Sequence, residues 1–401
     1  MNARVRMQAR SPHTRWWRRA GLVLWVVASV LVALLVLGAI IPAVPVVGYV
    51  GTEWVGPRPL WFVVFGLIIA VGAAVAWVRR MRRTALWTAV TSAVTAIGAA
   101  AVLTTQLLDA HSHHVPVSAA DVLAVDQPAA PPDHVIDYAR LGGRTLKAGL
   151  WTPPGGHPQG ARPMVVWVHG GGFSTGSRDQ REGDYRWLAD HGYPVVSIDY
   201  RLTPPPRWKD ASGDVICAMS RLARQVRPYG IDSSRTVLVG GSAGGSLALN
   251  VAYGLETGRI HSSCTTRLPA PPVAVAGFYP ASDLKGTWQD NGLLGYGREI
   301  TEAYTGGTPA QHPERYRYAS ATSRVRPGLM PTLLVTGASD HLIRQSRVHA
   351  LADRLRQAHD RAQFDAVPYS DHAFDATYHS IAGTISRTLL LRFLDGATPR
   401  T

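Results

Sequence analysis

The stretch RTVLVGGSAGGSLALN, residues 235–250, decides the fold. Its first five residues form a mostly apolar run of the kind found in a buried strand, and the residues from Gly245 onward read as the start of a helix. A serine at the centre of Gly-x-Ser-x-Gly between a strand and a helix is typical of a nucleophile elbow, a sharp turn that exposes the hydroxyl. The sequence therefore predicts that Ser242 stands on a tight, glycine-flanked turn above the edge of a sheet.

From about residue 134 onward, short apolar runs alternate with amphipathic segments. The runs predict strands covered on both faces, and their alternation with helices predicts an α/β fold with a mostly parallel sheet. The expected strands are 135–140, 145–152, 164–168, 194–198, 236–239, 273–278, 332–335 and 363–367. The expected helices are 184–191, 210–226, 246–255, 343–359 and 374–394. The polar and aromatic segment 285–330 interrupts this rhythm, and it could either cover a site or run over the surface.

A serine hydroxyl is a weak nucleophile and needs a base, usually a histidine that a carboxylate holds in the correct tautomer. Asp340 follows the expected strand 332–335, and His372 follows the last strand, so both are expected at the same sheet edge as Ser242. The order Ser, Asp, His along the chain fits this arrangement. Rival candidates nearby are Asp283, Asp371, Asp375, His341 and His379. We prefer Asp340 because it stands on the penultimate strand, and His372 because His379 is expected inside a helix.

A second glycine-rich run, His169-Gly-Gly-Gly-Phe173, follows the expected strand 164–168. Acyl transfer develops a negative charge on an oxygen, which fixed backbone N–H groups stabilise. Consecutive glycines let the backbone approach closely and turn its amides inward. We therefore expect the N–H groups of Gly171, Gly172 and Ala243 to form an oxyanion hole.

Three uncharged apolar stretches, 21–41, 60–78 and 84–108, dominate the first quarter of the chain. Each is long enough to cross about 30 Å of hydrocarbon as a helix. The first is too long for the core of a cleaved signal peptide, and the third could instead be a helix packed on the other two. The predicted organisation is a membrane region over 1–108, a linker over 109–133 and a catalytic domain over 134–397.

The formal charge of +14 is concentrated beside the apolar stretches, because residues 1–110 contain 11 arginines and only two acidic residues. No basic stripe with interleaved aromatic residues appears in the remainder, which argues against a nucleic-acid partner. Arginines precede the first stretch and separate the second from the third. The positive-inside rule then predicts a multi-pass protein of the cell membrane with a cytoplasmic N-terminus and an extracytoplasmic catalytic domain.

The two cysteines, Cys217 and Cys264, show neither C-x-x-C spacing nor a histidine-rich zinc pattern. Outside the cytoplasm they could form one disulfide, and otherwise they would be two thiols in apolar packing. The histidines of the linker, His111, His113 and His114, are interpreted as incidental, because no carboxylate partner can be argued from the sequence. We expect neither a metal ion nor a cofactor.

Residues 134–395 resemble the α/β-hydrolase superfamily, in particular the "fold-3" group related to hormone-sensitive lipase and bacterial acetyl esterases. The resemblance rests on the HGGGF run, Asp199-Tyr-Arg-Leu202, GGSAGG at 240–245, Asp340 and His372. It implies an α/β-hydrolase fold and cofactor-free hydrolysis of carboxylic esters, mostly with short or medium acyl chains, although some members are formamidases. Gly241 departs from the group, which often has aspartate just before the nucleophile. We interpret Asp199 and Arg201 as structural residues that fix the loops around the site.

These observations predict a membrane-anchored serine esterase that forms an acyl-enzyme on Ser242 and acts on a small-molecule or lipid-like ester. Two alternatives remain open at this stage. The acyl-enzyme could serve amide hydrolysis or acyl transfer to an acceptor in the cell envelope, or the fold could be a catalytically silent binding module in the membrane. The sequence does not define the acyl-chain length or the oligomeric state.

Overall fold

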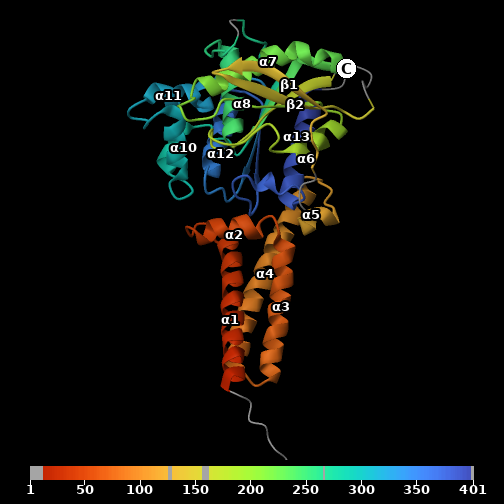
Figure 1. Cartoon of the computed structure of the whole chain (residues 1–401), viewed down its shortest axis with the longest axis vertical. Coiled ribbons are helices and arrows are strands. Elements are labelled where there is room, and N and C mark those ends of the chain that lie inside the picture. The colour runs from red at the N-terminus through yellow and green to blue at the C-terminus, as the bar shows by residue number, and fades with distance from the viewer. Residues whose placement is uncertain (1–11, 125–128, 156–161, 265–266, 399–401) are drawn as a thin grey trace, which may run out of the picture. The chain divides into compact units, whose positions relative to one another are not determined.

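The computed structural model describes residues 12–124, 129–155, 162–264 and 267–398. The chain divides into two compact units, residues 1–105 and residues 106–401 (Figure 1). Each unit has its own internal packing.

The described residues of the first unit form four helices: α1 (Pro12–Ile40), α2 (Val47–Val55), α3 (Pro59–Val78) and α4 (Arg82–Ser112), whose last turns belong to the second unit. The segments Ala20–Ile40, Pro59–Val78 and Arg82–Ser112 are long and apolar enough to span a membrane, close to the expected boundaries. Helix α2 was not expected, because it lies between the first two apolar stretches of the sequence. Close packing of Gly38 and Gly51 of α1 and α2 explains it, since a Cβ at Gly38 would lie 2.0 Å from the Val47 carbonyl oxygen.

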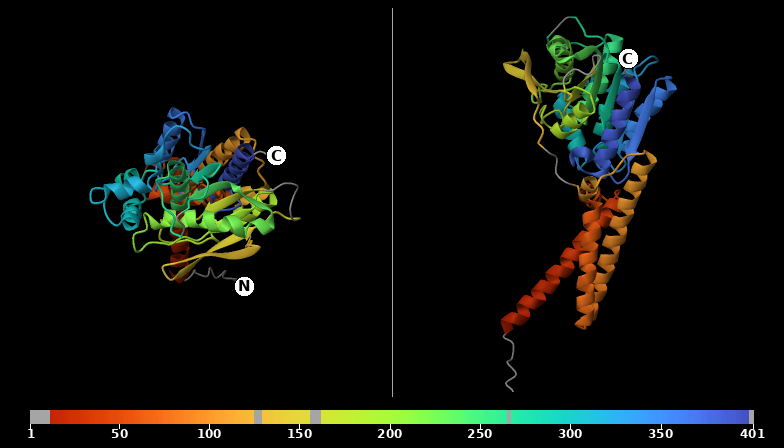
Figure 2. Two further views of the ribbon diagram at one scale, coloured as in Figure 1. Left: turned by 90° about the horizontal axis from the view of Figure 1, so that it is seen from above. Right: turned by 90° about the vertical axis from the view of Figure 1, so that its right-hand side faces the viewer.

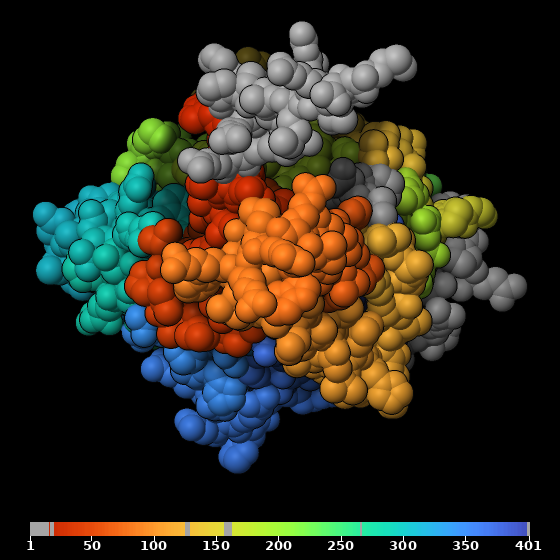
Figure 3. Space-filling view, turned by 90° about the horizontal axis from the view of Figure 1, so that it is seen from below, coloured from red at the N-terminus to blue at the C-terminus, as the bar shows by residue number. Residues whose placement is uncertain are grey.

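Small residues let the long helices approach one another closely. A Cβ at Gly66 of α3 would lie 2.7 Å from the Cβ of Ala96 on α4, and the Ser92 hydroxyl donates a 2.9 Å hydrogen bond to the Gly66 carbonyl. Close approach at small residues is the usual basis of helix association in apolar surroundings. The atoms of this unit form one continuous patch in the space-filling view (red and orange in Figure 3). Helix α1 diverges from α3 and α4 toward its N-terminal end (right view of Figure 2).

The second unit contains an eight-stranded sheet with the order β1-β2-β4-β3-β5-β6-β7-β8. β1 and β2 form an antiparallel hairpin, β2 pairs antiparallel with β4, and all other pairs are parallel. The strands are β1 (His134–Leu141), β2 (Arg144–Trp151), β3 (Arg162–Val168), β4 (Val195–Ile198), β5 (Ile231–Gly241), β6 (Ala274–Phe278), β7 (Thr332–Gly337) and β8 (Ala362–Val367). All eight expected strands are confirmed, as is the mostly parallel sheet of an α/β-hydrolase fold.

Helices cover both faces of this sheet because its strands are apolar on both sides. Val166 and Val168 of β3 share one core with α7 (Asp210–Gln225), α8 (Ala243–Thr257) and α12 (Gln345–Gln357). Trp167, which lies between these two valines, points to the other face of the sheet. Its ring centre lies 5.2 Å from that of Tyr185 on α6 (Glu182–Asp190). Helix α13 (Ile381–Ala397) lies beside α6 on that face, where Arg387 binds Asp184. Successive side chains of β3 point to opposite faces of the sheet, so one strand contributes to the helix layers on both sides.

Two expectations at the end of the unit need correction. The last helix was expected from residue 374, but a short 3-10 turn, η3 (Phe374–Ala376), comes first and α13 begins only at Ile381. Ser380 caps that helix by accepting a hydrogen bond from the N–H of Gly383. His379 therefore lies before the helix and not inside it.

Two parts of the segment assigned to a linker are helical. Helix α4 continues to Ser112, and α5 (Ala119–Leu123) follows with a capping box at Ser118. The Asp121 carboxylate contacts His379 and accepts a hydrogen bond from Thr384 of α13. Asp121 is only 5% exposed as a result. Residues 118–123 therefore pack with the rest of the second unit.

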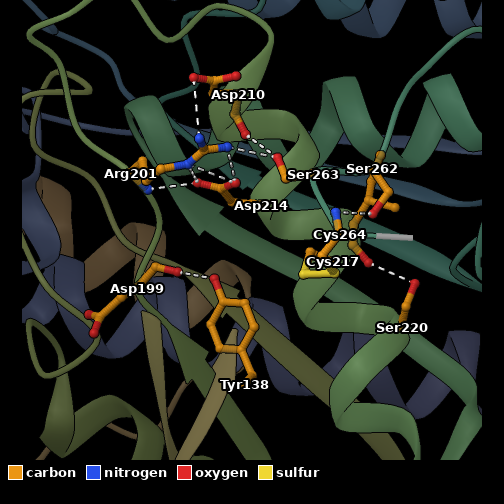
Figure 4. Close-up of a disulfide and its surroundings, with 11 residues drawn as sticks. Tyr138, Asp199, Arg201, Asp210, Asp214, Cys217, Ser220, Ser262, Ser263 and Cys264 are labelled. Carbon is orange, nitrogen blue, oxygen red and sulfur yellow. Dashed lines mark hydrogen bonds and ion pairs between the residues drawn. A yellow bond between two sulfur atoms is a disulfide. The ribbon is translucent and has the colours of Figure 1, made fainter. Parts of the chain in front are cut away.

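The two cysteines form a disulfide between α7 and the segment that follows α8 (Figure 4). Near it, Arg201 makes a bidentate contact with the buried Asp214 and donates to Ser263. Asp199 binds the guanidinium of Arg178 at 2.9 Å, and its carbonyl accepts from Tyr138. These bonds connect the loops on both sides of β4 to their neighbours, and they are consistent with a structural role for Asp199 and Arg201.

Candidate active site

Ser242 occupies a strained turn between β5 and α8. Its backbone angles, φ 53° and ψ −122°, are unusual for a residue with a side chain and are typical of a nucleophile elbow. The neighbouring glycines allow the turn to pack tightly, since a Cβ at Gly244 would lie 2.0 Å from the Val168 carbonyl oxygen. The Ser242 N–H donates to the Phe278 carbonyl at 2.8 Å, which fixes the turn against β6.

The structure brings Ser242, His372 and Asp340 together from three strand ends. His372 Nε2 lies 2.8 Å from Ser242 Oγ, and His372 Nδ1 lies 2.9 Å from Asp340 Oδ2. The other oxygen of Asp340 accepts hydrogen bonds from the backbone N–H groups of Leu342 and Ile343 at 2.9 and 2.7 Å. With Nδ1–H donating to the carboxylate, Nε2 is free to accept the serine proton. The three side chains thus form a continuous hydrogen-bond chain that suits nucleophilic catalysis.

The pKa of His372 is raised above its ordinary value of 6.5. Burial alone would lower it, but the charge and hydrogen bond of Asp340 act in the opposite direction and prevail, with help from Asp371 and Asp375. The carboxylates therefore favour the imidazolium that forms when the histidine accepts a proton. A histidine acting as general base must start neutral, so activity should fall as the pH drops through this raised pKa.

We expect Asp371→Asn to move the acidic limb of the kcat/KM profile to lower pH. The substitution removes one of the negative charges that raise the pKa of His372, so the imidazole stays neutral in more acidic solution. The profile would be measured with a short p-nitrophenyl ester and compared with that of Asp232→Asn, which changes a carboxylate remote from the site. A limb that moves to higher pH, or that does not move, would contradict this assignment of charges.

The structure also places the rival candidates. Asp371 pairs with His341 at 2.6 Å and accepts from the backbone N–H of His372, so these two rivals support each other next to the site. Asp283 caps α9 (Leu284–Asp290) through the N–H of Gly286. Asp375 accepts a 2.6 Å hydrogen bond from the Tyr279 hydroxyl. None of these rival side chains contacts the Ser242 hydroxyl among the hydrogen bonds of the described residues.

The HGGGF loop lies directly against the elbow. A Cβ at Gly170 would lie 3.1 Å from the Gly241 carbonyl oxygen, and Gly171 and Gly172 have φ of 110° and 58°. In the described part of the chain, the N–H groups of Gly171 and Gly172 have no hydrogen-bond acceptor. Ala243 is the first residue of α8, where an N–H has no acceptor within the helix. Three backbone donors are therefore available near the Ser242 hydroxyl.

A cavity of about 290 Å³ opens at this point, and its lining includes Gly171, Gly172, Ser242 and His372. Its walls are mostly apolar or aromatic and come from Trp167, Tyr279, Tyr296 and Leu342. Tyr296 belongs to α10 (Tyr296–Thr305), so part of the segment 285–330 does line the site. A Cβ at Gly172 would lie 2.7 Å from the Tyr296 hydroxyl, which shows how closely this helix approaches the HGGGF loop.

A charged cluster beneath the cavity was not predicted from the sequence. Arg181 lines the cavity and pairs with Asp184, at 2.8 Å, and with Asp375. Asp375 also accepts from Tyr279, whose ring packs edge-on against His372 at 4.8 Å. No motif indicates this cluster, because Arg181 and Asp184 are neighbours at the start of α6 whereas Tyr279 and Asp375 come from two other segments and meet them only in the folded chain. Among the described residues, no group of three or more His, Cys, Asp or Glu side chains is placed to hold a metal ion.

The family model described as BD-FAE matches residues 150–355, just over half of the chain. The chain belongs to this family of α/β-hydrolase esterases. Among curated proteins, this esterase is 32% identical over 257 residues to the ethyl acetate hydrolase of Pseudomonas putida, covering 61% of the chain and 77% of that protein. It is 28% identical over 240 residues to esterase LipC of Mycobacterium tuberculosis, covering 58% of each.

Solved structures show the same fold. Esterase 2 of Thermogutta terrifontis superimposes with a TM-score of 0.55 at 21% identity, covering 68% of this esterase and 97% of that chain. A bacterial heroin esterase superimposes with a TM-score of 0.57 at 21% identity, covering 67% and 84%. The shared fold thus accounts for about two thirds of this esterase.

Proposed function

We propose that this esterase hydrolyses carboxylic esters with Ser242 as nucleophile, His372 as general base and acid, and Asp340 as the residue that orients the histidine. The observation that carries the proposal is the hydrogen-bond chain of 2.8 and 2.9 Å that links the three side chains. His372 takes the proton of Ser242 as Oγ attacks the ester carbonyl, and the resulting oxyanion is held by the N–H groups of Gly171, Gly172 and Ala243.

The first half-reaction ends when the C–O bond to the alcohol breaks and His372 gives its proton to the departing oxygen. In the second, His372 removes a proton from water, the hydroxide attacks the acyl carbon, and Ser242 leaves with that proton restored. Proton transfers balance over the cycle, and the pocket supplies every group that they require. An acceptor other than water would turn the same acyl-enzyme toward transfer, which added alcohols and product analysis would reveal.

The cavity favours a small acyl group. Its volume is about 290 Å³, at the small end for ligand pockets, and Leu342 and Tyr296 contribute to its walls. The similarity to an ethyl acetate hydrolase supports the same substrate class. A series of p-nitrophenyl esters tests it: kcat/KM should be highest for acetate or butyrate and fall for longer chains. A maximum for a long-chain ester would contradict this view of the cavity.

We further propose that the three apolar helices anchor the esterase in the cell membrane, with the catalytic unit on the extracytoplasmic side. Their lengths and the arginines before the first helix and between the second and third support this topology. The Cys217–Cys264 disulfide supports it as well, because disulfides persist in oxidising compartments.

Topology can be checked with a C-terminal alkaline phosphatase fusion, which is active only outside the cytoplasm. We expect the fusion after Thr401 to be active and a matched fusion after Arg80, between the second and third spans, to be inactive. An inactive phosphatase after Thr401 would place the catalytic unit in the cytoplasm.

Reduction of the disulfide, or the double substitution Cys217→Ala with Cys264→Ala, should lower the free energy of unfolding by about 2–5 kcal/mol, as for other disulfides that close long loops.

A further inference from the structure

A second cavity, of about 780 Å³, lies outside the active site and has no lining residue in common with it. It forms where the C-terminal end of α8 meets α11 (Pro313–Ala319) and the 3-10 turn η2 (Ala321–Arg324). Ser242 precedes α8, so the 15 residues of that helix separate the two cavities by about 20 Å, at 1.5 Å per residue. The catalytic mechanism makes no use of this second cavity.

The lining of the second cavity carries an excess of positive charge. Arg259, Arg317, Arg324 and Arg326 all contribute to it, whereas Glu314 is its single acidic residue. Arg259 and Arg317 are exposed, and no described carboxylate lies within ion-pair distance of either guanidinium. Like charges gathered in a concave surface concentrate a positive potential there, which attracts anions.

Arg324 is held in place without being neutralised. It donates hydrogen bonds to the Asn250 side-chain oxygen at 2.7 Å and to the carbonyls of Tyr318 and Arg259 at 2.9 and 3.2 Å. Its guanidinium also lies 5.0 Å from the centre of the Tyr318 ring. Burial lowers the pKa of Arg324, and the charge of Arg259 acts in the same direction. An anion bound nearby would relieve this repulsion.

A structural role explains only part of the cluster. Arg326 donates to the Glu256 carbonyl in the last turn of α8 and lies 3.6 Å from the Glu256 carboxylate. Cations are favourable at the C-terminal end of a helix, so Arg324 and Arg326 are partly explained by α8 itself. The same effect applies to Arg317, which lies in the last turn of α11. It does not account for the side chain of Arg259, which follows α8 and has no hydrogen-bond partner among the described residues.

We propose that this cavity binds a ligand that carries a phosphate group, either a soluble phosphate ester or the headgroup of an anionic phospholipid. Guanidinium groups bind phosphate oxygens in a bidentate manner. A phosphate group carries more negative charge than a carboxylate, so it is the better ligand for several guanidinium groups at once. Trp208 and Tyr318, whose rings meet edge to face at 5.2 Å, add an aromatic wall for the organic part of the ligand. The volume is ample for such a molecule.

The test compares the full-length protein with two double variants in nanodiscs of phosphatidylcholine, with inorganic pyrophosphate as the probe in calorimetric titrations. Arg259→Gln with Arg317→Gln removes the two exposed charges of the cavity that have no described carboxylate partner. Arg354→Gln with Arg361→Gln removes two exposed charges elsewhere and serves as the matched control. Hydrolysis of p-nitrophenyl acetate, which neither pair should change, confirms that both variants are folded.

We expect saturable binding of pyrophosphate by the unmodified chain and by the control variant, and binding weaker by about tenfold or more for the cavity variant. Loss of even one hydrogen bond to a charged group changes an equilibrium constant by roughly that factor. Repeating the titration in nanodiscs that contain phosphatidylglycerol distinguishes the sources: competition indicates a lipid headgroup, and unchanged affinity indicates a soluble ligand. Absence of saturable binding, or equal affinity of the cavity and control variants, would overturn the proposal.

Discussion

Ser242→Ala should reduce kcat for a short p-nitrophenyl ester by about a millionfold, the loss seen when a serine hydrolase of the triad type loses its nucleophile. The expected size of the effect follows from the mechanism. Without Oγ no acyl-enzyme can form, and the N–H groups of Gly171 and Gly172 can then assist only direct attack by water. Residual activity should reflect that assistance alone.

The matched control is Ser220→Ala on α7, where the hydroxyl donates only to the Ile216 carbonyl of its own helix. That variant should keep its activity, and both variants should show the same thermal unfolding as the unmodified chain. Ser242 packs at a strained turn, and alanine keeps the Cβ, so the fold has no reason to change. A Ser242→Ala protein that retains even a tenth of the activity would exclude Ser242 as the nucleophile.

Asp340→Asn should lower kcat by about four orders of magnitude while leaving the fold intact, as in trypsin-like enzymes in which the corresponding carboxylate becomes an amide. One oxygen of Asp340 already accepts from the N–H groups of Leu342 and Ile343. The amide oxygen of asparagine would keep those two bonds, so its NH₂ group would face His372 Nδ1. The histidine would then carry its proton on Nε2, toward Ser242, and could no longer accept the serine proton.

Asp353→Asn on α12 is the control, because Asp353 is solvent-accessible and pairs only with neighbours on its own helix. It should leave kcat unchanged. Crystal structures of the two variants would add a direct check, since the Ser242–His372 distance should survive in Asp340→Asn even though activity is lost. A variant of Asp340 with near-normal kcat would mean that another carboxylate, such as Asp371, orients His372.

The strands and the position of the three catalytic candidates were predictable because each depends on local pattern. A buried parallel strand is a continuous apolar run, and residues that directly follow such runs meet at one sheet edge. This pattern located Ser242, Asp340 and His372, and the structure has all eight strands within a few residues of their expected positions. The chemistry of a serine nucleophile then limited which residue types could accompany it.

Features that depend on contacts between distant segments were not predictable from the same patterns. Helix α2 exists because glycines of α1 and α2 allow close packing, which no periodicity in 47–55 indicates. The start of α13 is set by Ser380 and by the 3-10 turn before it, whereas the sequence predicted a helix that begins at residue 374. The contact of Arg181 with Asp375 beneath the cavity joins two segments that lie far apart in the sequence.

The central claim, that Ser242 is the nucleophile, is tested most directly by locating a covalent adduct. Paraoxon phosphorylates esterase 2 of Thermogutta terrifontis, which has the same fold, and an activated serine is the group that such a reagent should modify here. After treatment of the folded full-length chain, peptide mass spectrometry should find a single diethylphosphoryl group on Ser242, and none in Ser242→Ala. A stoichiometric adduct on another residue, or an unmodified Ser242 in treated protein that has lost its esterase activity, would contradict the account.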